Sequence, residues 1–296
     1  MKHICFLLLL LGVTLTSCSS DEEQEQNLDG RKLRQLTISE VPVTRATLTD
    51  NESVLGATWK EGDQATYFNV STFGGDNIDS GTLRASASAS TSAFTGTVRC
   101  KADDNVALFY PYQDVPIQDP GRGTFTVSLA GQDGTLATIA ERFHYVYGVA
   151  AVTSVTDNTA NATIDDMQSL LAVCKFSFTD GTNAIPVKTL TINYYENSFS
   201  YKMGYPLSAT LDPSSGSPTE LTYPYQQDWN KDGLSVTLGS ETSDGVYVAL
   251  FPPFSPTGYM YMHFEVTNGN GTYIGTAKAT LKAGKYYPVS LKLTKQ

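Results

Sequence analysis

The sequence of 296 residues carries a formal charge of −10 and has no basic cluster, so nucleic-acid binding is not expected. Its length corresponds to about two domains. Only 17% of the residues are charged, and Gly, Ser, Thr, Asn and Tyr are abundant, a composition typical of an extracellular all-β protein with many turns.

Residues 1–17 are predicted to be a lipoprotein signal peptide. A short basic start precedes an apolar run at 4–14, which is too short to span a bilayer. The run ends in Leu15-Thr16-Ser17-Cys18, the pattern of a bacterial lipoprotein box. Acylation of Cys18 would anchor the chain firmly, because each buried methylene contributes about 0.8 kcal/mol. The alternative is an ordinary secretory signal with an incidental cysteine.

Residues 18–30 are polar and acidic, which predicts a flexible tether between the lipid and the folded body. Within it, the acidic run at 21–23 resembles the surface-export signal of Bacteroidetes lipoproteins. Together these features predict a protein that is lipid-anchored in the outer membrane and exposed on the cell surface.

Beyond the tether, short runs rich in Val, Thr, Phe and Tyr alternate with Gly, Asn, Asp and Pro, which predicts β-sandwiches. The predicted strands cover 32–38, 65–73, 94–98, 106–110, 125–129, 145–152, 173–178, 189–195, 234–238, 247–251, 259–266, 273–281 and 286–293. Helical periodicity is weak, and only 136–142 and 165–170 are expected to form one or two helical turns.

A short internal sequence repeat supports two similar domains in tandem. The run VALFYP at 106–111 is matched by VALFPP at 248–253, and both have the pattern of a buried strand stopped by proline. We place the boundary near Asp166, which predicts an N-terminal β-sandwich at 31–166 and a C-terminal β-sandwich at 167–296.

Two cysteines, Cys100 and Cys174, remain in the predicted body of the protein, each within a strand-like run. An oxidising cell envelope would permit a disulfide between them. Buried free thiols are the favoured interpretation, because sequence spacing does not establish the geometry that a disulfide needs.

The sequence offers little chemistry for catalysis or metal binding. His144 and His263 are isolated, whereas metal sites and nucleophile–base pairs need clustered ligands. The adjacent acids at 103–104 and 165–166 are expected to be solvated loop charges. No cofactor motif is present, and we therefore expect no enzyme activity, no cofactor and no catalytic or metal-binding residue.

One loop, DWNKDG at 228–233, imitates the start of a calcium-binding loop. Its twelfth position is Gly239, where a bidentate Glu is expected to close such a site. A surface loop is therefore favoured, with calcium binding as the alternative.

Four segments in order along the chain carry a resemblance to a known family. They are WKEGD at 59–63 with ATYF at 65–68, LFYPY at 108–112, QDGT at 132–135 with YVYG at 145–148, and LKAGKYYPVSL at 281–291. Together they resemble the fimbrillin-like proteins of Bacteroidetes, the family of major and minor fimbrial subunits. The resemblance implies two tandem transthyretin-like β-sandwich domains and a role in assembly and cell adhesion.

The resemblance also implies how such subunits assemble. They are cut after an arginine, which removes an N-terminal strand, and the exposed groove accepts a strand from another fimbrial subunit by β-strand addition. The matching positions here are Arg45 and Ala46. The removable segment would be an edge strand within 33–43, with Leu36 and Ile38 on one face because they are two residues apart. The alternative is that Arg45 is an ordinary exposed arginine.

The position of the subunit within a fimbria follows from a departure from the family pattern. Stalk subunits usually carry a C-terminal donor extension, whereas this sequence stops soon after the strand predicted at 286–293. A tip, anchor or accessory role is therefore expected, with a host or bacterial surface molecule as ligand.

A second hypothesis is a surface lipoprotein that binds glycans. It is motivated by a group of aromatic and polar side chains, because flat rings next to polar groups can stack on sugars: Tyr223, Tyr225, Gln226, Gln227, Asp228 and Trp229. The same rings would equally fill the end of a sandwich.

Overall fold

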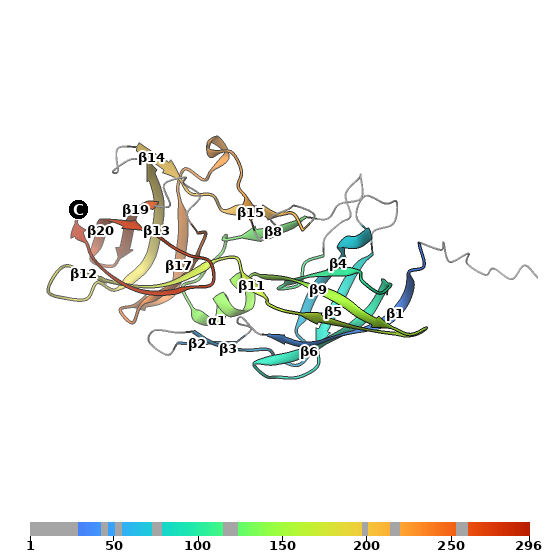
Figure 1. Ribbon diagram of the computed structural model, residues 1–296. Helices are drawn as coiled ribbons and strands as arrows, with labels where there is room; N and C mark the ends of the chain where they lie inside the picture. Colours follow the sequence, from blue (N-terminus) through green and yellow to red (C-terminus); the bar gives the residue numbers. More distant parts are fainter. Residues whose placement is uncertain are drawn as a thin grey trace, which may run out of the picture.

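The computed structural model describes residues 29–42, 47–50, 55–72, 79–114, 124–196, 201–213, 220–252 and 260–296. These residues form strands joined by turns and a few short helices, so the predicted all-β class is confirmed. Among them, no helix is both long and apolar enough to cross a membrane. Figure 1 shows the strands gathered in two groups, with β1 in one and β13 in the other.

Eight strands of the first group form one sheet, in the order β10-β1-β6-β5-β4-β7-β9-β11. They are β1 (Lys32–Pro42), β4 (Gln64–Asn69), β5 (Ser80–Ala85), β6 (Thr91–Cys100), β7 (Asn105–Tyr110), β9 (Val146–Val155), β10 (Thr159–Ile164) and β11 (Gln168–Ser169). Strand β9 also pairs with β10, so the sheet closes on itself. We call this unit the closed sheet. It differs from the two separate sheets that a sandwich implies, because β1 bridges β6 and β10.

The second group has two sheets that face each other. One contains β18 (Val246–Leu250), β12 (Ala172–Thr179) and β21 (Tyr286–Lys292). The other contains β14 (Tyr201–Gly204), β17 (Leu234–Thr242), β13 (Val187–Glu196), β19 (Met260–Asn268), β20 (Gly271–Ala279) and β22 (Thr294–Lys295). The rings of Phe176 on β12 and Phe264 on β19 meet across the interior, with centroids 5.1 Å apart. We call this unit the open sandwich.

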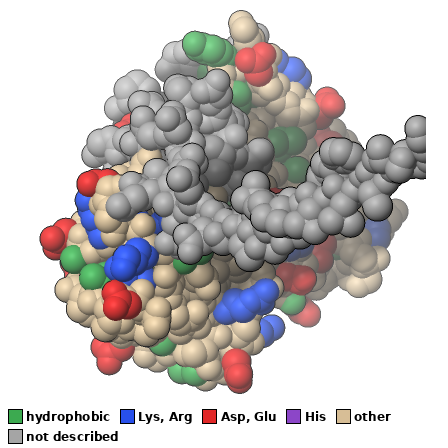
Figure 2. All heavy atoms as spheres, turned by 90° about the vertical axis from the view of Figure 1, so that its right-hand side faces the viewer, with side chains coloured by type: hydrophobic (Ala, Val, Ile, Leu, Met, Phe, Trp, Pro, Cys, Tyr) green, Lys and Arg blue, Asp and Glu red, His purple; other side chains and the backbone are tan. Residues whose placement is uncertain are grey.

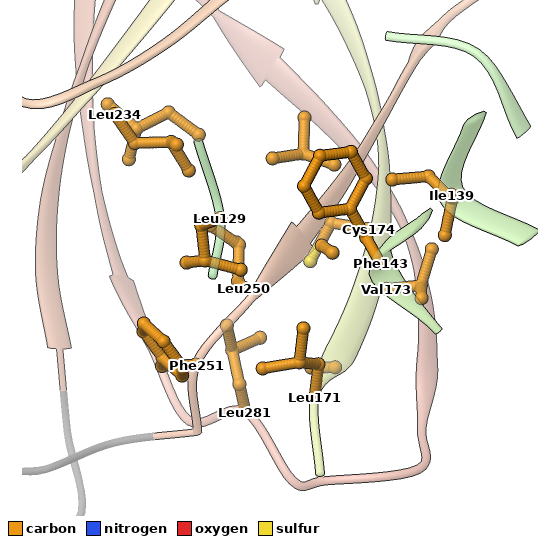
Figure 3. Close-up of a cluster of buried hydrophobic side chains, with 14 of the residues drawn as sticks. Leu129, Ile139, Phe143, Leu171, Val173, Cys174, Leu234, Leu250, Phe251 and Leu281 are labelled. Atoms are coloured by element: carbon orange, nitrogen blue, oxygen red, sulfur yellow. The ribbon is translucent and has the colours of Figure 1, made fainter. Parts of the chain in front are cut away.

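A middle segment packs on the open sandwich. Strand β8 (Phe125–Ser128) forms a small sheet with β15 (Ser208–Leu211) and β16 (Leu221–Thr222). It is followed by α1 (Leu136–Thr138) and the π-helix η2 (Ile139–Phe143), which confirms the helical turns predicted at 136–142. Figure 3 shows side chains from this segment, among them Leu129 and Phe143, in the same apolar cluster as Leu250. Strand β8 lies before Asp166 in the sequence but pairs with β15, which lies after it. The division of the chain at Asp166 therefore remains a proposal.

Two apolar cores correspond to the two groups of strands. The core of the closed sheet includes Leu36, Ile38, Trp59 and Phe94. The larger core is formed by side chains of the open sandwich, of the middle segment and of the outer face of β4, β7 and β9. Cys100 lies in the first core and Cys174 in the second, and both are buried free thiols, as predicted. Burial raises the pKa of the Cys100 thiol to about 11, which keeps it protonated at neutral pH.

Every strand predicted from the sequence is present, although the exact bounds differ by a few residues. The helical turn predicted at 165–170 is wrong, because residues 168–169 form β11 and pair with β9. The sequence patterns missed β5, β10, β14, β15, β16 and the hairpin of β2 (Thr47–Asp50) and β3 (Leu55–Thr58). Short 3₁₀ turns occur at η1 (Val70–Thr72) and η3 (Gln226–Asp228).

Charged side chains of both signs lie interspersed over the described part of the face at the closed-sheet end (Figure 2).

Candidate functional site

The residues predicted to act in assembly fall into two sets. Cys18, Arg45 and Ala46 lie outside the described residues. Leu36 and Ile38 lie in β1 and are fully buried in the core of the closed sheet. The candidate site is therefore β1 together with the slot that it fills between β6 and β10.

Strand β1 is an internal strand, so the prediction of an edge strand is wrong. It pairs antiparallel with β6 from Lys32 opposite Cys100 to Pro42 opposite Thr91, and parallel with β10 along residues 35–39. The second neighbour exists because the β9–β10 hairpin folds β10 alongside β1. Removal of β1 would consequently leave two open sheet edges, each with unpaired backbone groups.

The inward face of β1 carries Arg34, Leu36, Ile38 and Val41, each of which is buried. The first three alternate with outward residues as a strand requires. A β-bulge then shifts the register between Ile38 and Val41, and Glu40 adopts a left-handed conformation with φ of 52°. The bulge returns Val41 to the core, which lengthens the apolar contact that β1 makes.

Trp59 of the WKEGD motif holds the end of β1 nearest Val41. Its indole nitrogen donates a hydrogen bond to the Val41 carbonyl oxygen at 3.1 Å. Its ring packs edge-on against Phe94 and Tyr110, with centroid distances of 4.9 and 5.2 Å. The motif therefore fills the base of the closed sheet and contacts β1 directly.

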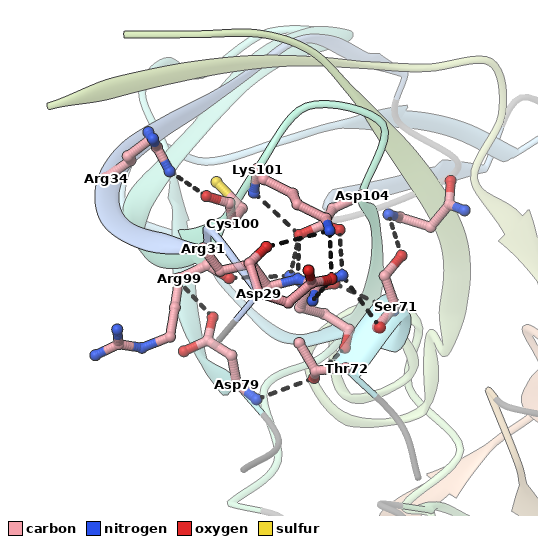
Figure 4. Close-up of polar contacts among 12 residues, drawn as sticks. Asp29, Arg31, Arg34, Ser71, Thr72, Asp79, Arg99, Cys100, Lys101 and Asp104 are labelled. Carbon is pink, nitrogen blue, oxygen red and sulfur yellow. Dashed lines mark hydrogen bonds and ion pairs between the residues drawn. The ribbon is translucent and has the colours of Figure 1, made fainter. Parts of the chain in front are cut away.

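A polar cluster holds the opposite end of β1 (Figure 4). Arg31 donates two hydrogen bonds to the Asp104 carboxylate, from Nε to Oδ2 at 2.8 Å and from Nη2 to Oδ1 at 2.7 Å. Arg34 donates to the carbonyl oxygens of Thr156, at 2.6 Å, and Cys100. These contacts tie the start of β1 to the loop after β6 and to the turn between β9 and β10.

Asp104 is the main surprise of this cluster. The expectation of a solvated loop charge holds for Asp103, Asp165 and Asp166, which are exposed, and is wrong for Asp104, whose side chain is 2% exposed. Its carboxylate also accepts hydrogen bonds from Asn69 Nδ2 at 2.9 Å and from the Lys101 backbone nitrogen at 3.0 Å. Burial favours the protonated form, but these hydrogen bonds and Arg31 outweigh it and hold the pKa of Asp104 below its usual range.

A second carboxylate, Asp79, lies near this cluster. It accepts hydrogen bonds from the Arg99 backbone nitrogen at 2.7 Å and from the Tyr67 hydroxyl at 3.1 Å. Burial is the largest influence and raises the pKa of Asp79 to about 6. The two carboxylates therefore differ in charge state at mildly acidic pH, because an arginine side chain donates hydrogen bonds to Asp104, whereas Asp79 accepts from the backbone nitrogen of Arg99.

The chain that follows the predicted cleavage position is fastened elsewhere. Asp50, on the β2–β3 hairpin, accepts hydrogen bonds from Lys175 Nζ at 2.8 Å and from the Tyr247 hydroxyl at 2.6 Å. Both partners belong to the open sandwich. The hairpin is therefore held independently of β1, and a cut between residues 42 and 47 would leave β1 attached only by noncovalent contacts.

The aromatic group that motivated glycan binding does not form an exposed platform. Trp229 is buried against Tyr194, and its indole nitrogen donates to the Pro224 carbonyl at 3.0 Å. Tyr223 packs edge-on against Phe251 at 5.2 Å, and only Tyr225 is largely exposed. Two of the three rings therefore fill the end of the open sandwich.

The remaining candidate residues lie apart from the β1 slot. In the loop at 228–233, Asn230 Nδ2 donates to the Gly233 carbonyl at 2.7 Å, as in a tight turn, and Gly239 lies on β17. His144 follows η2, whereas His263 lies on β19 beside Tyr195. Within the described ranges, no group of three or more His, Cys, Asp or Glu side chains is placed to hold a metal ion.

Comparisons with solved structures find matches at low sequence identity. A "putative cell adhesion protein" from Bacteroides ovatus matches with a TM-score of 0.52 and 14% identity, covering 90% of this chain and 97% of that chain. A protein of the same description from Bacteroides fragilis matches with a TM-score of 0.46 and 10% identity, covering 88% and 92%. The tip fimbrial protein Mfa3 from Porphyromonas gingivalis matches with a TM-score of 0.38 and 10% identity, covering 88% and 94%.

No protein-family model matches the sequence, and no curated protein does. The similarity to the Bacteroides ovatus protein extends over nearly all of both chains and establishes the fold that the two share.

Proposed function

We propose that this chain is a fimbrillin-like fimbrial subunit that assembles by strand exchange and contributes to cell adhesion. The observation that carries the proposal is the placement of β1: an internal strand with a fully buried apolar face, joined to the rest of the chain through the segment that contains Arg45. The sequence motifs and the fold shared with the Bacteroides ovatus protein support the same family.

The mechanism follows from the two ladders of β1. A cut after Arg45 leaves β1 held only by its hydrogen bonds, its buried side chains and the polar cluster. Burial of Leu36, Ile38 and Val41 contributes about 1.5–3 kcal/mol each, so β1 does not leave readily without a replacement. An incoming strand of a second subunit can pair with β6 and β10 and fill the same pockets.

Delivery to the surface is a separate part of the proposal. Lipidation of Cys18 would anchor the precursor in the outer membrane, and the two transthyretin-like domains, 31–166 and 167–296, would form its body. Substitution Cys18→Ala should release the protein from washed outer membranes. Firm retention of the variant would contradict lipid anchoring without affecting the strand-exchange mechanism.

Strand exchange is tested with an arginine-specific protease and a fluorescent peptide of residues 29–42. The protein cut after Arg45, verified by mass spectrometry and freed of protease before the Arg-containing peptide is added, should take up the peptide in exchange for its own β1, whereas the uncut protein should not. Arg45→Ala is the matched control and should resist both cutting and exchange. Equal uptake by cut and uncut protein would contradict the mechanism.

The expected tip, anchor or accessory role remains a prediction. Cut protein that caps partner subunits without forming fibres alone would support it, and long fibres of this protein alone would favour a stalk role.

A further inference from the structure

The two ends of the β1 slot differ in what they require of a strand. At the Trp59 end, the contact is a hydrogen bond to a backbone carbonyl, which any residue supplies. At the Asp104 end, the contact is between side chains, with Arg31 on the buried carboxylate. Only the second contact depends on which amino acid the strand carries.

Loss of β1 would change the surroundings of Asp104 in a specific way. Arg31 would leave, and Asp29, whose carboxylate contacts Lys101 Nζ at 2.5 Å, would leave with it. The carboxylate would keep its hydrogen bonds from Asn69 and the Lys101 backbone nitrogen, neither of which carries a charge. An apolar strand that then closed the slot would bury this carboxylate without its bidentate arginine partner, which is strongly unfavourable.

We propose that the slot selects incoming strands by charge. It accepts an extended segment of another subunit that places an arginine at the Asp104 end, five residues from the first inward-facing apolar side chain, as Arg31 stands relative to Leu36. The inference rests on the strand exchange proposed above and adds a chemical requirement for the partner. Arginine fits best because its planar guanidinium donates both hydrogen bonds of the bidentate contact.

The other basic residues at this end of β1 do not impose the same requirement on an incoming strand. Lys32 is the adjacent cation on β1, but its side chain is 55% exposed and lies 3.5 Å from Asp157, which is itself 91% exposed. Arg34 is buried, but its acceptors are neutral carbonyl groups, so a strand without a cation at this position would leave no unpaired charge. Lys32 is therefore the matched control for a charge that should not matter.

The test is a competition experiment on full-length protein whose residues 43–46 are replaced by the recognition sequence of a site-specific protease. After cutting, a fluorescent peptide of residues 29–42 is displaced by unlabelled variants of the same peptide. We expect Arg31→Gln to compete at least thirtyfold more weakly than the natural sequence, Arg31→Lys to be intermediate, and Lys32→Gln to lie within threefold. In protein carrying Asp104→Asn, the penalty of Arg31→Gln should fall below threefold.

A second arm asks whether the rule applies to a foreign strand. An unrelated alternating peptide with apolar residues at the positions of Leu36, Ile38 and Val41 should bind at least tenfold more tightly with Arg than with Gln at the Asp104 end. If the natural peptide binds but Arg31→Gln binds equally well, charge selection is wrong and strand exchange stands. If the natural peptide does not exchange at all, the proposed function itself fails. The peptide arms need no altered protein core, so they are informative even if Asp104→Asn does not fold.

Discussion

The closed sheet and the open sandwich protect their strand edges in different ways. In the closed sheet, β1 is paired on both sides and its inward side chains are fully buried. In the open sandwich, β21 also runs parallel to its neighbour, but no described strand pairs with its other side, and its side chains are only partly buried or exposed. Pro288 lies within β21, as is common for edge strands, because proline cannot donate to a further ladder.

This difference indicates where a partner strand can enter. The outer edge of β21 discourages pairing. The outer side of β18 is occupied by Gln132, whose side chain exchanges two hydrogen bonds with the Ala249 backbone, and by Gly134, whose carbonyl accepts one from the Tyr247 backbone nitrogen. In the described part of the closed sheet, β1 itself offers no free edge, because it pairs with β6 on one side and β10 on the other. Under the proposed mechanism, a cut followed by departure of β1 would therefore turn the better-protected unit into the one that needs a strand.

The largest expected contrast is in core packing. Ile38→Ala should reduce the free energy of unfolding of the closed sheet by about 2–5 kcal/mol, because a fully buried side chain is lost. Val289→Ala on β21 should cost only about 1 kcal/mol, since Val289 is partly exposed. Urea unfolding measures both, and equal losses would contradict the difference in burial between the two strands.

A tryptophan in each unit gives the next test. Trp59→Phe removes the hydrogen bond to Val41 and should destabilise the protein by about 1–3 kcal/mol. In cut protein it should also speed the release of a labelled β1 peptide at least fivefold. Trp229→Phe removes a comparable hydrogen bond in the open sandwich, and release of β1 should then stay within twofold of the unmodified rate. Equal acceleration by both substitutions would show that general destabilisation controls release.

A smaller effect depends on pH and on the carboxylates beside β1. The raised pKa of Asp79 means that the folded state binds its proton more tightly than the unfolded state, so this stabilisation is full below about pH 4 and is lost as pH rises through about 6. Asparagine does not titrate, so Asp79→Asn removes this loss of stability with rising pH. Relative to the natural protein, the variant should gain about 1–2 kcal/mol between pH 4.5 and 7.5. Asp165→Asn, an exposed change in the same half, is the control, and a constant difference for Asp79→Asn would refute the assignment.

The smallest expected effect concerns the hairpin after the cleavage segment. Asp50→Asn weakens the contact with Lys175 and should cost about 0.5–1 kcal/mol, because the pair is partly exposed. In cut protein, we expect faster proteolysis within residues 47–58 while uptake of the β1 peptide is unchanged. Loss of peptide uptake would indicate that the hairpin and the slot are coupled.

Sequence patterns predicted the individual strands better than their arrangement. Alternation in β1 and the apolar run of β7 identified both strands, and the spacing of Leu36 and Ile38 predicted their shared buried face. Strand β10, with the sequence TANATI, was missed because Ala and Asn are poor strand formers. Without β10, β1 had only one expected neighbour, and the closure of the sheet was not foreseen.

The polar part of the site was not predictable for a different reason. The local sequence around Asp104 is that of a solvated turn, and its partner Arg31 lies 73 positions away. Burial of a carboxylate depends on such a distant partner, which local patterns do not contain. Trp59 was identified through its motif, but its contact with β1 became apparent only from the packing.

The most direct test of the central claim is hydrogen–deuterium exchange, measured before and after β1 is removed. Cutting between residues 42 and 47 and washing out the β1 peptide should expose amides of β6 within 92–100 and of β10 within 159–163, while β12, β13 and β19 keep their protection. Adding back the peptide of residues 29–42 should restore protection in β6 and β10. Unchanged protection of β6 and β10, or equal loss throughout the open sandwich, would contradict the claim that β1 fills a replaceable slot.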